Sequence, residues 1–90
     1  MEDEQKHKDE KKQEYNIIVN GEPKNESKKE LNFAEILNIA FPPPRTIPEK
    51  DYSITFKGAA SEPHQGQLYL GGKVEIMDGT SFDVTPTNKS

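Results

Sequence analysis

The stretch YNIIVNG, residues 15–21, decides the fold of this 90-residue chain. Its first five residues are mostly apolar and partly β-branched, a composition typical of a strand. Asn20 and Gly21 both tolerate the positive φ of a tight turn, so they predict a hairpin. We expect the returning strand from about Glu22 to Glu30. Because that segment is polar and contains Pro23, which cannot donate to a ladder, it should lie at a sheet edge.

A short helix is predicted next along the chain. Asn32 offers an N-cap, and Glu35, three residues later, completes a capping-box pattern. Four apolar residues then fall on one face of a helix. They are Phe33, Ile36, Leu37 and Ala40. The three prolines at 42–44 forbid continuation, so the helix should end near Phe41.

The second half of the chain predicts strands joined by turns. Residues 52–57 alternate apolar and polar, which is typical of a half-buried strand. Residues 67–70 form a short apolar run before a Gly-Gly turn at 71–72, and residues 81–85 predict the last strand. The hairpin and the helix each carry an apolar side that must be buried against the other. We therefore expect an α+β fold of the β-grasp type over residues 15–86, with a mixed four- to five-stranded sheet packed on one short helix.

The charge of the chain is concentrated at its N-terminus. Residues 1–14 hold ten charged side chains and a single apolar residue, Met1. Such a segment cannot bury enough surface to offset the entropy of ordering, so we expect a disordered tail. It has no apolar core of the kind that signal peptides carry, and no apolar run in the chain approaches a membrane span. We expect a cytoplasmic protein with no membrane partner.

Composition also disfavours several classes of function. The net charge is −4, and no Lys/Arg cluster with interleaved aromatic residues appears, so no nucleic-acid partner is expected. The chain has no Cys, hence no disulfide, thiolate ligand or Cys nucleophile. His7 and His64 are far apart and lack further ligands at organised spacing, and Ser61 near His64 has no predicted orienting partner. We expect no catalysis, metal or cofactor.

Three segments resemble the bacterial multiubiquitin family of ubiquitin-like domains. They are residues 15–22, the helix at 33–41 with its following prolines, and the closing segment FDVTPTNKS at 82–90. The resemblance covers residues 15–90. It implies a single β-grasp domain that acts as a protein modifier and is not itself an enzyme. The partners that it implies are an E1-like activating enzyme, an E2-like carrier enzyme and a JAB-type metallopeptidase.

We expect a flexible C-terminal segment at 87–90, and the same resemblance makes it the candidate site of conjugation. Its residues are Thr87, Asn88, Lys89 and Ser90. Ubiquitin and its sulfur-carrier relatives end in Gly-Gly, so this ending disfavours a sulfur carrier and leaves three alternatives. The enzyme accepts a bulkier end, a peptidase trims the segment first, or the chain is never conjugated. Four tail lysines are candidate acceptors for another copy, which would build a chain: Lys6, Lys8, Lys11 and Lys12.

A second interpretation assumes the same fold but no covalent reaction. The chain would be a non-covalent adaptor or assembly subunit with an inert C-terminus. Partners or further copies would then dock on the predicted edge strand at 22–30, by strand addition, or on Tyr69 and Leu70. These two residues are weighed equally as core and as partner-docking surface.

Overall fold

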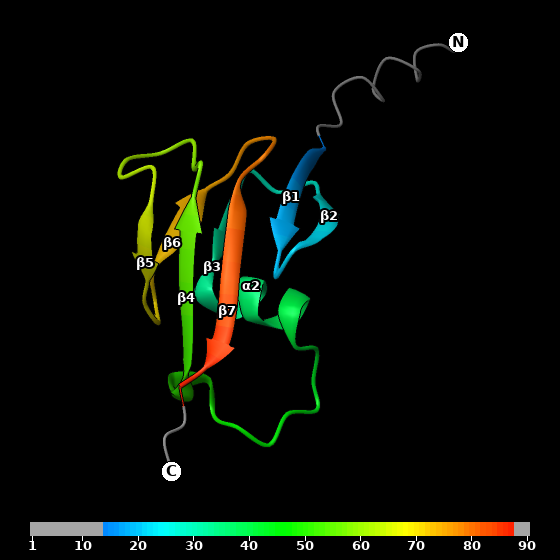
Figure 1. Ribbon diagram of the computed structural model, residues 1–90, viewed down its shortest axis with the longest axis vertical. Coiled ribbons are helices and arrows are strands. Elements are labelled where there is room, and N and C mark those ends of the chain that lie inside the picture. The colour runs from blue at the N-terminus through cyan, green and yellow to red at the C-terminus, as the bar shows by residue number, and fades with distance from the viewer. Residues whose placement is uncertain (1–13, 88–90) are drawn as a thin grey trace, which may run out of the picture.

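The computed structural model describes residues 14–87, drawn in colour in Figure 1. Within that range no helix has the length and apolar character needed to cross a membrane. The elements in chain order are β1 (Tyr15–Val19), β2 (Glu22–Glu26), β3 (Glu30–Asn32), α2 (Phe33–Ala40), η1 (Glu49–Asp51), β4 (Tyr52–Lys57), β5 (Gly66–Leu68), β6 (Lys73–Glu75) and β7 (Ser81–Pro86). Residues 1–13 of the predicted tail, including His7 and the four candidate acceptor lysines, lie outside the described residues.

The main sheet has five strands in the order β2-β1-β7-β4-β5. The β1–β7 pair is parallel, with Ile18 opposite Ser81 and Val19 opposite Phe82. The other neighbouring pairs are antiparallel. Figure 1 shows α2 on one side of this sheet, behind β4 and β7. A mixed five-stranded sheet with one short helix confirms the predicted α+β, β-grasp class.

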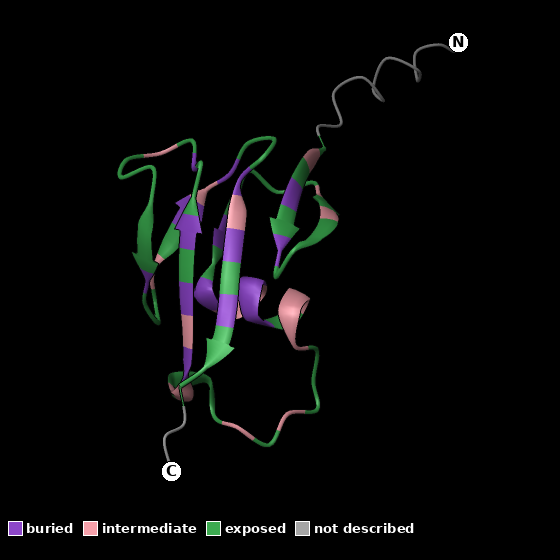
Figure 2. Ribbon diagram, in the orientation of Figure 1, coloured by how far each residue is buried: buried purple, intermediate pink, exposed green. Residues whose placement is uncertain are grey.

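The core lies between α2 and the inner face of the sheet. Buried and exposed residues alternate along β4 and β7, as the bands along both strands show in Figure 2. The inner positions include Ile54 and Val84, exposed by 0% and 1%. Apolar residues of the predicted helix face and of the predicted strands 52–57 and 81–85 are buried: Phe33, Ile36, Leu37, Ile54, Phe56, Phe82 and Val84. Ala40, on the predicted helix face, is partly buried and packs against this core.

The predicted strand from Glu22 to Glu30 is wrong in its extent. The strand β2 ends at Glu26, opposite Tyr15, where β1 begins. Beyond that point β1 offers no residue to pair with, so the chain leaves the sheet edge. It re-forms as β3, which pairs with β6 in a separate two-stranded sheet. Leu31 of β3 reaches the core there, with 1% of its surface exposed.

Two smaller differences concern segments near the candidate site. The apolar run 67–70 is only partly strand, because β5 ends at Leu68. The connection before β4 ends in a 3-10 turn, η1, whose last residue is Asp51. The other predicted strands at 15–19, 52–57 and 81–85 are confirmed, the last extending to Pro86.

The turn at Asn20-Gly21 also fastens β1 to β7. Asn20 and Gly21 have φ of 53° and 81°, as the hairpin prediction requires. The Asn20 side chain accepts a hydrogen bond from the Val84 N–H at 2.8 Å and donates one to the Val84 carbonyl at 3.1 Å. Its amide therefore continues the parallel ladder beyond the end of β1. This explains why Asn suits the position better than another residue that tolerates positive φ.

Replacing Asn20 by Asp should destabilise the domain. The Asp carboxylate can still accept from the Val84 N–H, but its second oxygen faces the Val84 carbonyl, which loses its donor. We expect a loss of about 1–3 kcal/mol in the free energy of unfolding, measured by urea denaturation. The matched control is Asn25→Asp on the exposed side of β2, expected within about 0.5 kcal/mol of the parent chain. Equal effects of the two substitutions would contradict the role given to Asn20.

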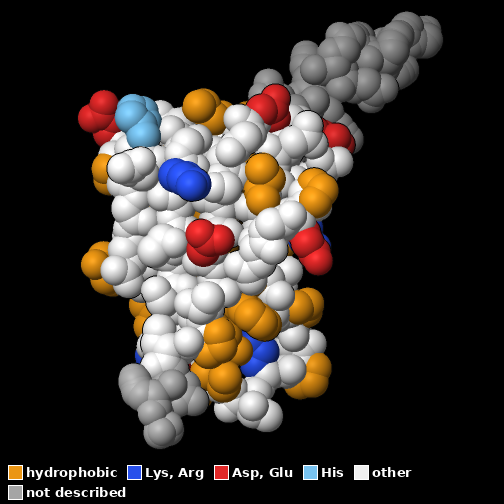
Figure 3. All heavy atoms as spheres, in the orientation of Figure 1, with side chains coloured by type: hydrophobic (Ala, Val, Ile, Leu, Met, Phe, Trp, Pro, Cys, Tyr) orange, Lys and Arg blue, Asp and Glu red, His pale blue; other side chains and the backbone are white. Residues whose placement is uncertain are grey.

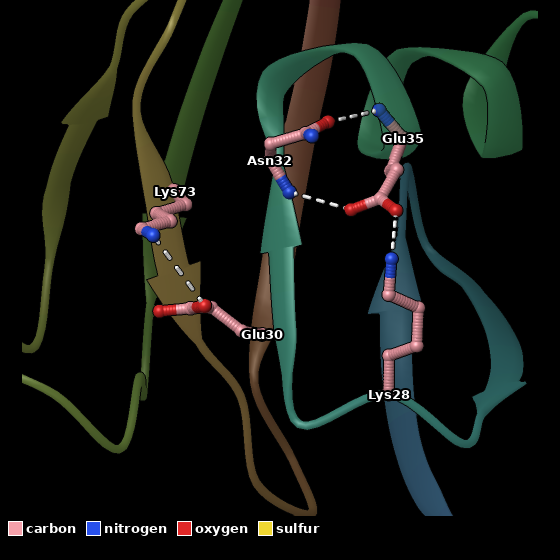
Figure 4. Close-up of polar contacts among 5 residues, drawn as sticks. All are labelled: Lys28, Glu30, Asn32, Glu35 and Lys73. Carbon is pink, nitrogen blue, oxygen red and sulfur yellow. Dashed lines mark hydrogen bonds and ion pairs between the residues drawn. The ribbon is translucent and has the colours of Figure 1, made fainter.

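The helix α2 begins with the predicted capping box. The Asn32 side chain accepts from the Glu35 N–H at 2.8 Å, and the Asn32 N–H donates to the Glu35 carboxylate at 2.9 Å. The same carboxylate accepts a hydrogen bond from Lys28, as Figure 4 shows. The hydrogen bond from Lys28, followed by that from the Asn32 backbone, lowers the pKa of Glu35 below its usual range. Its charged form is therefore preferentially stabilised in the folded state.

The sign of this pKa shift predicts how stability responds to acid. The pKa of Glu35 is lower in the folded chain than in the unfolded chain. The ionised carboxylate therefore stabilises the fold fully at pH values above the unfolded pKa of about 4.3. This stabilisation is lost as the pH falls through the folded pKa. The Glu35→Gln variant should therefore lose less stability than the parent between about pH 6 and pH 3, in urea midpoints measured across that range.

A matched control removes one carboxylate from an exposed loop. Glu62→Gln changes the net charge by the same amount at a side chain that is 84% exposed. The urea midpoint of this variant should change with pH in the same way as that of the parent chain. If the stability of Glu35→Gln falls with pH as steeply as that of the parent chain, the stabilising role given to the Glu35 charge is wrong.

Candidate functional site

The C-terminal segment leaves the domain from the interior of the sheet. The strand β7 lies between β1 and β4 and ends with Pro86 opposite Tyr52. The next residue, Thr87, donates two hydrogen bonds to the Asp51 carbonyl, from its N–H at 2.7 Å and from its hydroxyl at 3.0 Å. The flexible segment predicted at 87–90 thus has an anchored first residue. Asn88, Lys89 and Ser90 lie outside the described residues.

A groove opens beside the start of β4, next to Thr87. The pairing of β5 with β4 runs only from Phe56 to Ile54, so Tyr52 and Ser53 extend beyond the end of β5. The space left there has a volume of about 430 Å³. It is lined by Phe33, Lys50, Tyr52, Ser53, Gln67, Leu68, Tyr69, Leu70 and Thr87. The root of the candidate conjugation segment is therefore part of the groove wall.

The predicted glycine turn builds the opposite wall of the groove. The Gly72 N–H donates to the Tyr69 carbonyl at 2.8 Å, which closes a turn over residues 69–72. Gly71 has a φ of +84°, and a Cβ on Gly72 would lie 3.1 Å from both the Tyr69 oxygen and a Leu68 methyl carbon. The Gly72 carbonyl also accepts from the Phe33 N–H at 3.2 Å. The turn is thus fixed to the start of α2, and both glycines have structural roles.

Tyr69 and Leu70 lie at the surface rather than in the core. Their exposed fractions are 66% and 52%, the largest among the described large apolar residues. They sit on the turn, above a groove floor that includes the buried residues Phe33, Tyr52 and Leu68. Lys50, on the rim, has 72% of its side chain exposed. Among the described residues that line the groove, it alone carries a charge.

The outer face of the sheet offers a different kind of surface. The residues of β4 and β7 that point away from α2 are polar: Ser53, Thr55, Lys57, Ser81, Asp83 and Thr85. Figure 3 looks onto this side and shows its central part as mostly white, with isolated charged and hydrophobic side chains. The described part of these strands therefore forms no apolar patch on this face.

The remaining candidate side chains support the loop that carries them. The Ser61 hydroxyl accepts from the Glu75 N–H at 3.2 Å, and His64 Nδ1 lies 2.9 Å from the Ala59 carbonyl oxygen. Neither contact joins Ser61 to His64, so these two described residues do not form a nucleophile–base pair. Over residues 14–87, no group of three potential ligands gathers closely enough to hold a metal ion.

Sequence reasoning missed most of the groove. Lys50 and Asp51 were assigned to no helix or strand. Tyr52 was placed at the start of a strand, with no prediction of which strand lies beside it. The available signal was the Gly-Gly pair at 71–72, because a turn this close to the apolar run shortens the strand before it. No local pattern indicated that Thr87 would bond to Asp51, 36 residues earlier.

A comparison with known families places this geometry in context. The model of the multiubiquitin family matches residues 15–88, which include all the strands and the helix described above. Comparisons with curated proteins and with solved structures returned no match. The matched range covers most of the chain and agrees with the β-grasp topology found in the structure. The chain therefore belongs to the multiubiquitin family and contains a ubiquitin-like domain.

Proposed function

We propose that the chain is a ubiquitin-like protein modifier that reacts through a carboxylate in its C-terminal segment. The observation that carries this proposal is the family match over residues 15–88, which extends through β7 to the candidate conjugation segment. The strand that precedes this segment is held between two neighbours in the sheet. The segment thus emerges from a rigid part of the domain, which suits it for insertion into a partner's active site.

The proposed chemistry needs an enzyme and ATP in addition to this chain. A carboxylate oxygen of Ser90, or of an upstream residue after trimming, attacks the α-phosphorus of ATP on an E1-like enzyme. Pyrophosphate leaves and an acyl adenylate forms. A nucleophile then attacks the carbonyl carbon, AMP leaves, and the proton of the nucleophile passes to solvent. Transfer through an E2-like enzyme repeats the acyl exchange and ends on an amino group of the target.

The remaining parts of the proposal concern residues outside the described range. A JAB-type metallopeptidase would trim the segment or release the modifier. Lys6, Lys8, Lys11 and Lys12 would accept a further copy, which would build chains. We place these reactions in the cytoplasm, where the proposed enzymes would find ATP.

A second candidate function is a non-covalent adaptor. The exposure of Tyr69 and Leu70 favours it, because apolar side chains at the surface support docking without covalent chemistry. Strand addition at β2 receives less support. Pro23 removes a donor from that edge, and Lys24, opposite Ile17, lies on the inner side of the sheet beside Glu22 at 3.5 Å. Proline and inward-facing charges are features that protect an edge strand from pairing.

Incubation with ATP and an E1-like enzyme tests the modifier function. We expect the intact mass of the chain to rise by one adenylate, or a covalent adduct with the enzyme to form. Fragmentation should map the modified carboxylate to residues 87–90. If an enzyme that is active on another modifier leaves the mass unchanged, with the peptidase also present, the modifier function is wrong.

Deletion of Lys89 and Ser90 separates the two candidate functions. In a modifier that reacts at Ser90, the deletion should abolish the adduct, and in one that reacts at a trimmed end it should remove the need for the peptidase. An adaptor should keep its partner with unchanged affinity. The control is a chain that lacks residues 1–13, which should still be activated because the domain and the C-terminal segment are intact. Loss of activation in both variants would show that the effect is not specific to the C-terminal segment.

A further inference from the structure

We propose that the groove beside Thr87 is the surface by which the activating enzyme recognises this domain. The enzyme would fill it with an apolar side chain and place an acidic side chain opposite Lys50. This inference rests on the proposed function, because it names the enzyme that acts on the C-terminal carboxylate. It adds to that function the contact surface on this chain and the chemistry of the surface that fits it.

The first support is the distance between the groove and the reacting group. Thr87 lines the groove and is fixed to Asp51 by two hydrogen bonds. In the proposed function the carboxylate belongs to one of residues 87–90. Three extended residues span about 10 Å, so an active site that holds the carboxylate lies within that distance of the groove. The body of the enzyme therefore has to cover the surface next to Thr87.

The second support is the apolar character of the groove. Its floor includes Phe33 and Leu68, and its turn presents Tyr69 and Leu70 to solvent. Aromatic anchors surrounded by other contacts are common energetic centres of protein interfaces. The outer side of β4 and β7 is polar, whereas the groove is an apolar surface beside the root of the segment.

The third support is the charge at the rim. The Lys50 Nζ lies 3.9 Å from the Asp51 Oδ1, and most of the lysine side chain is in solvent. This ion pair is therefore weak. An acidic side chain of the enzyme could meet its ammonium group while the neighbouring apolar groups are covered. Charged contacts at an interface rim mainly increase the rate of association and depend on salt.

Other occupants fit the groove less well. The residues that follow Thr87 are Asn, Lys and Ser, which are polar and would repeat the positive charge of Lys50. A second copy of this chain would bring the same Lys50 to a two-fold contact between grooves. The first arrangement brings no apolar side chain to the groove, and the second places two lysines together.

The test measures the rate of adduct formation by the E1-like enzyme against the concentration of the full chain. The variants Tyr69→Ser and Leu70→Ser should each raise KM by about 10-fold or more while kcat stays within about twofold, because docking is weakened and the carboxylate is unchanged. Lys50→Gln should raise KM at low salt and remove most of its salt dependence. Urea midpoints should match the parent chain, since all three side chains are exposed.

Two control variants make the same chemical changes elsewhere. Met77→Ser removes another exposed apolar side chain, and Lys57→Gln removes a lysine from the outer face of the sheet. Both should keep the parent KM to within about twofold. Sedimentation of the free chain should show a monomer at the assay concentrations.

The outcomes separate this inference from the function on which it rests. If the parent chain forms the adduct and the groove variants keep its KM, the inference is wrong and the modifier function stands. A dimer that Tyr69→Ser dissociates would assign the groove to a second copy instead. If the parent chain forms no adduct with an active enzyme, the modifier function and this inference fall together.

Discussion

The parallel pairing of β1 with β7 is the constraint on which the rest of the structure depends. It joins the two ends of the domain, with Val19 opposite Phe82 and the Asn20 amide bonded to Val84, 64 residues later. Closing so long a loop costs conformational entropy that only a shared core can offset. That core forms because Ile17, Val19, Phe82 and Val84 all face α2. Once β7 is in place, β4 pairs along its other edge and the groove beside Thr87 exists.

Local signals in the sequence predicted the elements well. The Asn-Gly turn, the capping box at Asn32 and Glu35 and the alternation along residues 52–57 each act within a few residues, and the structure contains all three. The prolines at 42–44 ended the helix as expected. Each of these features is a backbone preference that does not depend on distant parts of the chain, so a single sequence is sufficient to show it.

Contacts between distant segments were not predictable in the same way. The strand expected at 22–30 divides because β1 is too short to pair with all of it, and its second part is drawn to β6 by the burial of Leu31. The groove depends on where β5 leaves β4, and the anchor of Thr87 depends on a backbone carbonyl of η1. Every residue has a backbone carbonyl, so the sequence does not show which one will accept a hydrogen bond. The candidate residues Tyr69 and Leu70 were found from their apolar character, but only the turn geometry shows that they are exposed.

The parallel arrangement of the terminal strands also has a mechanical consequence. In Figure 1 the chain enters β1 near one end of the molecule and leaves β7 near the other. A force applied between the two ends of the domain would therefore pull the two neighbouring strands along their lengths in opposite directions. Their backbone bonds and the Asn20 amide would carry the load together in shear, rather than opening one after another. A domain pulled from its two ends should therefore resist stretching far better than its small core suggests. A protein-unfolding machine would meet its greatest resistance at the β1–β7 pair.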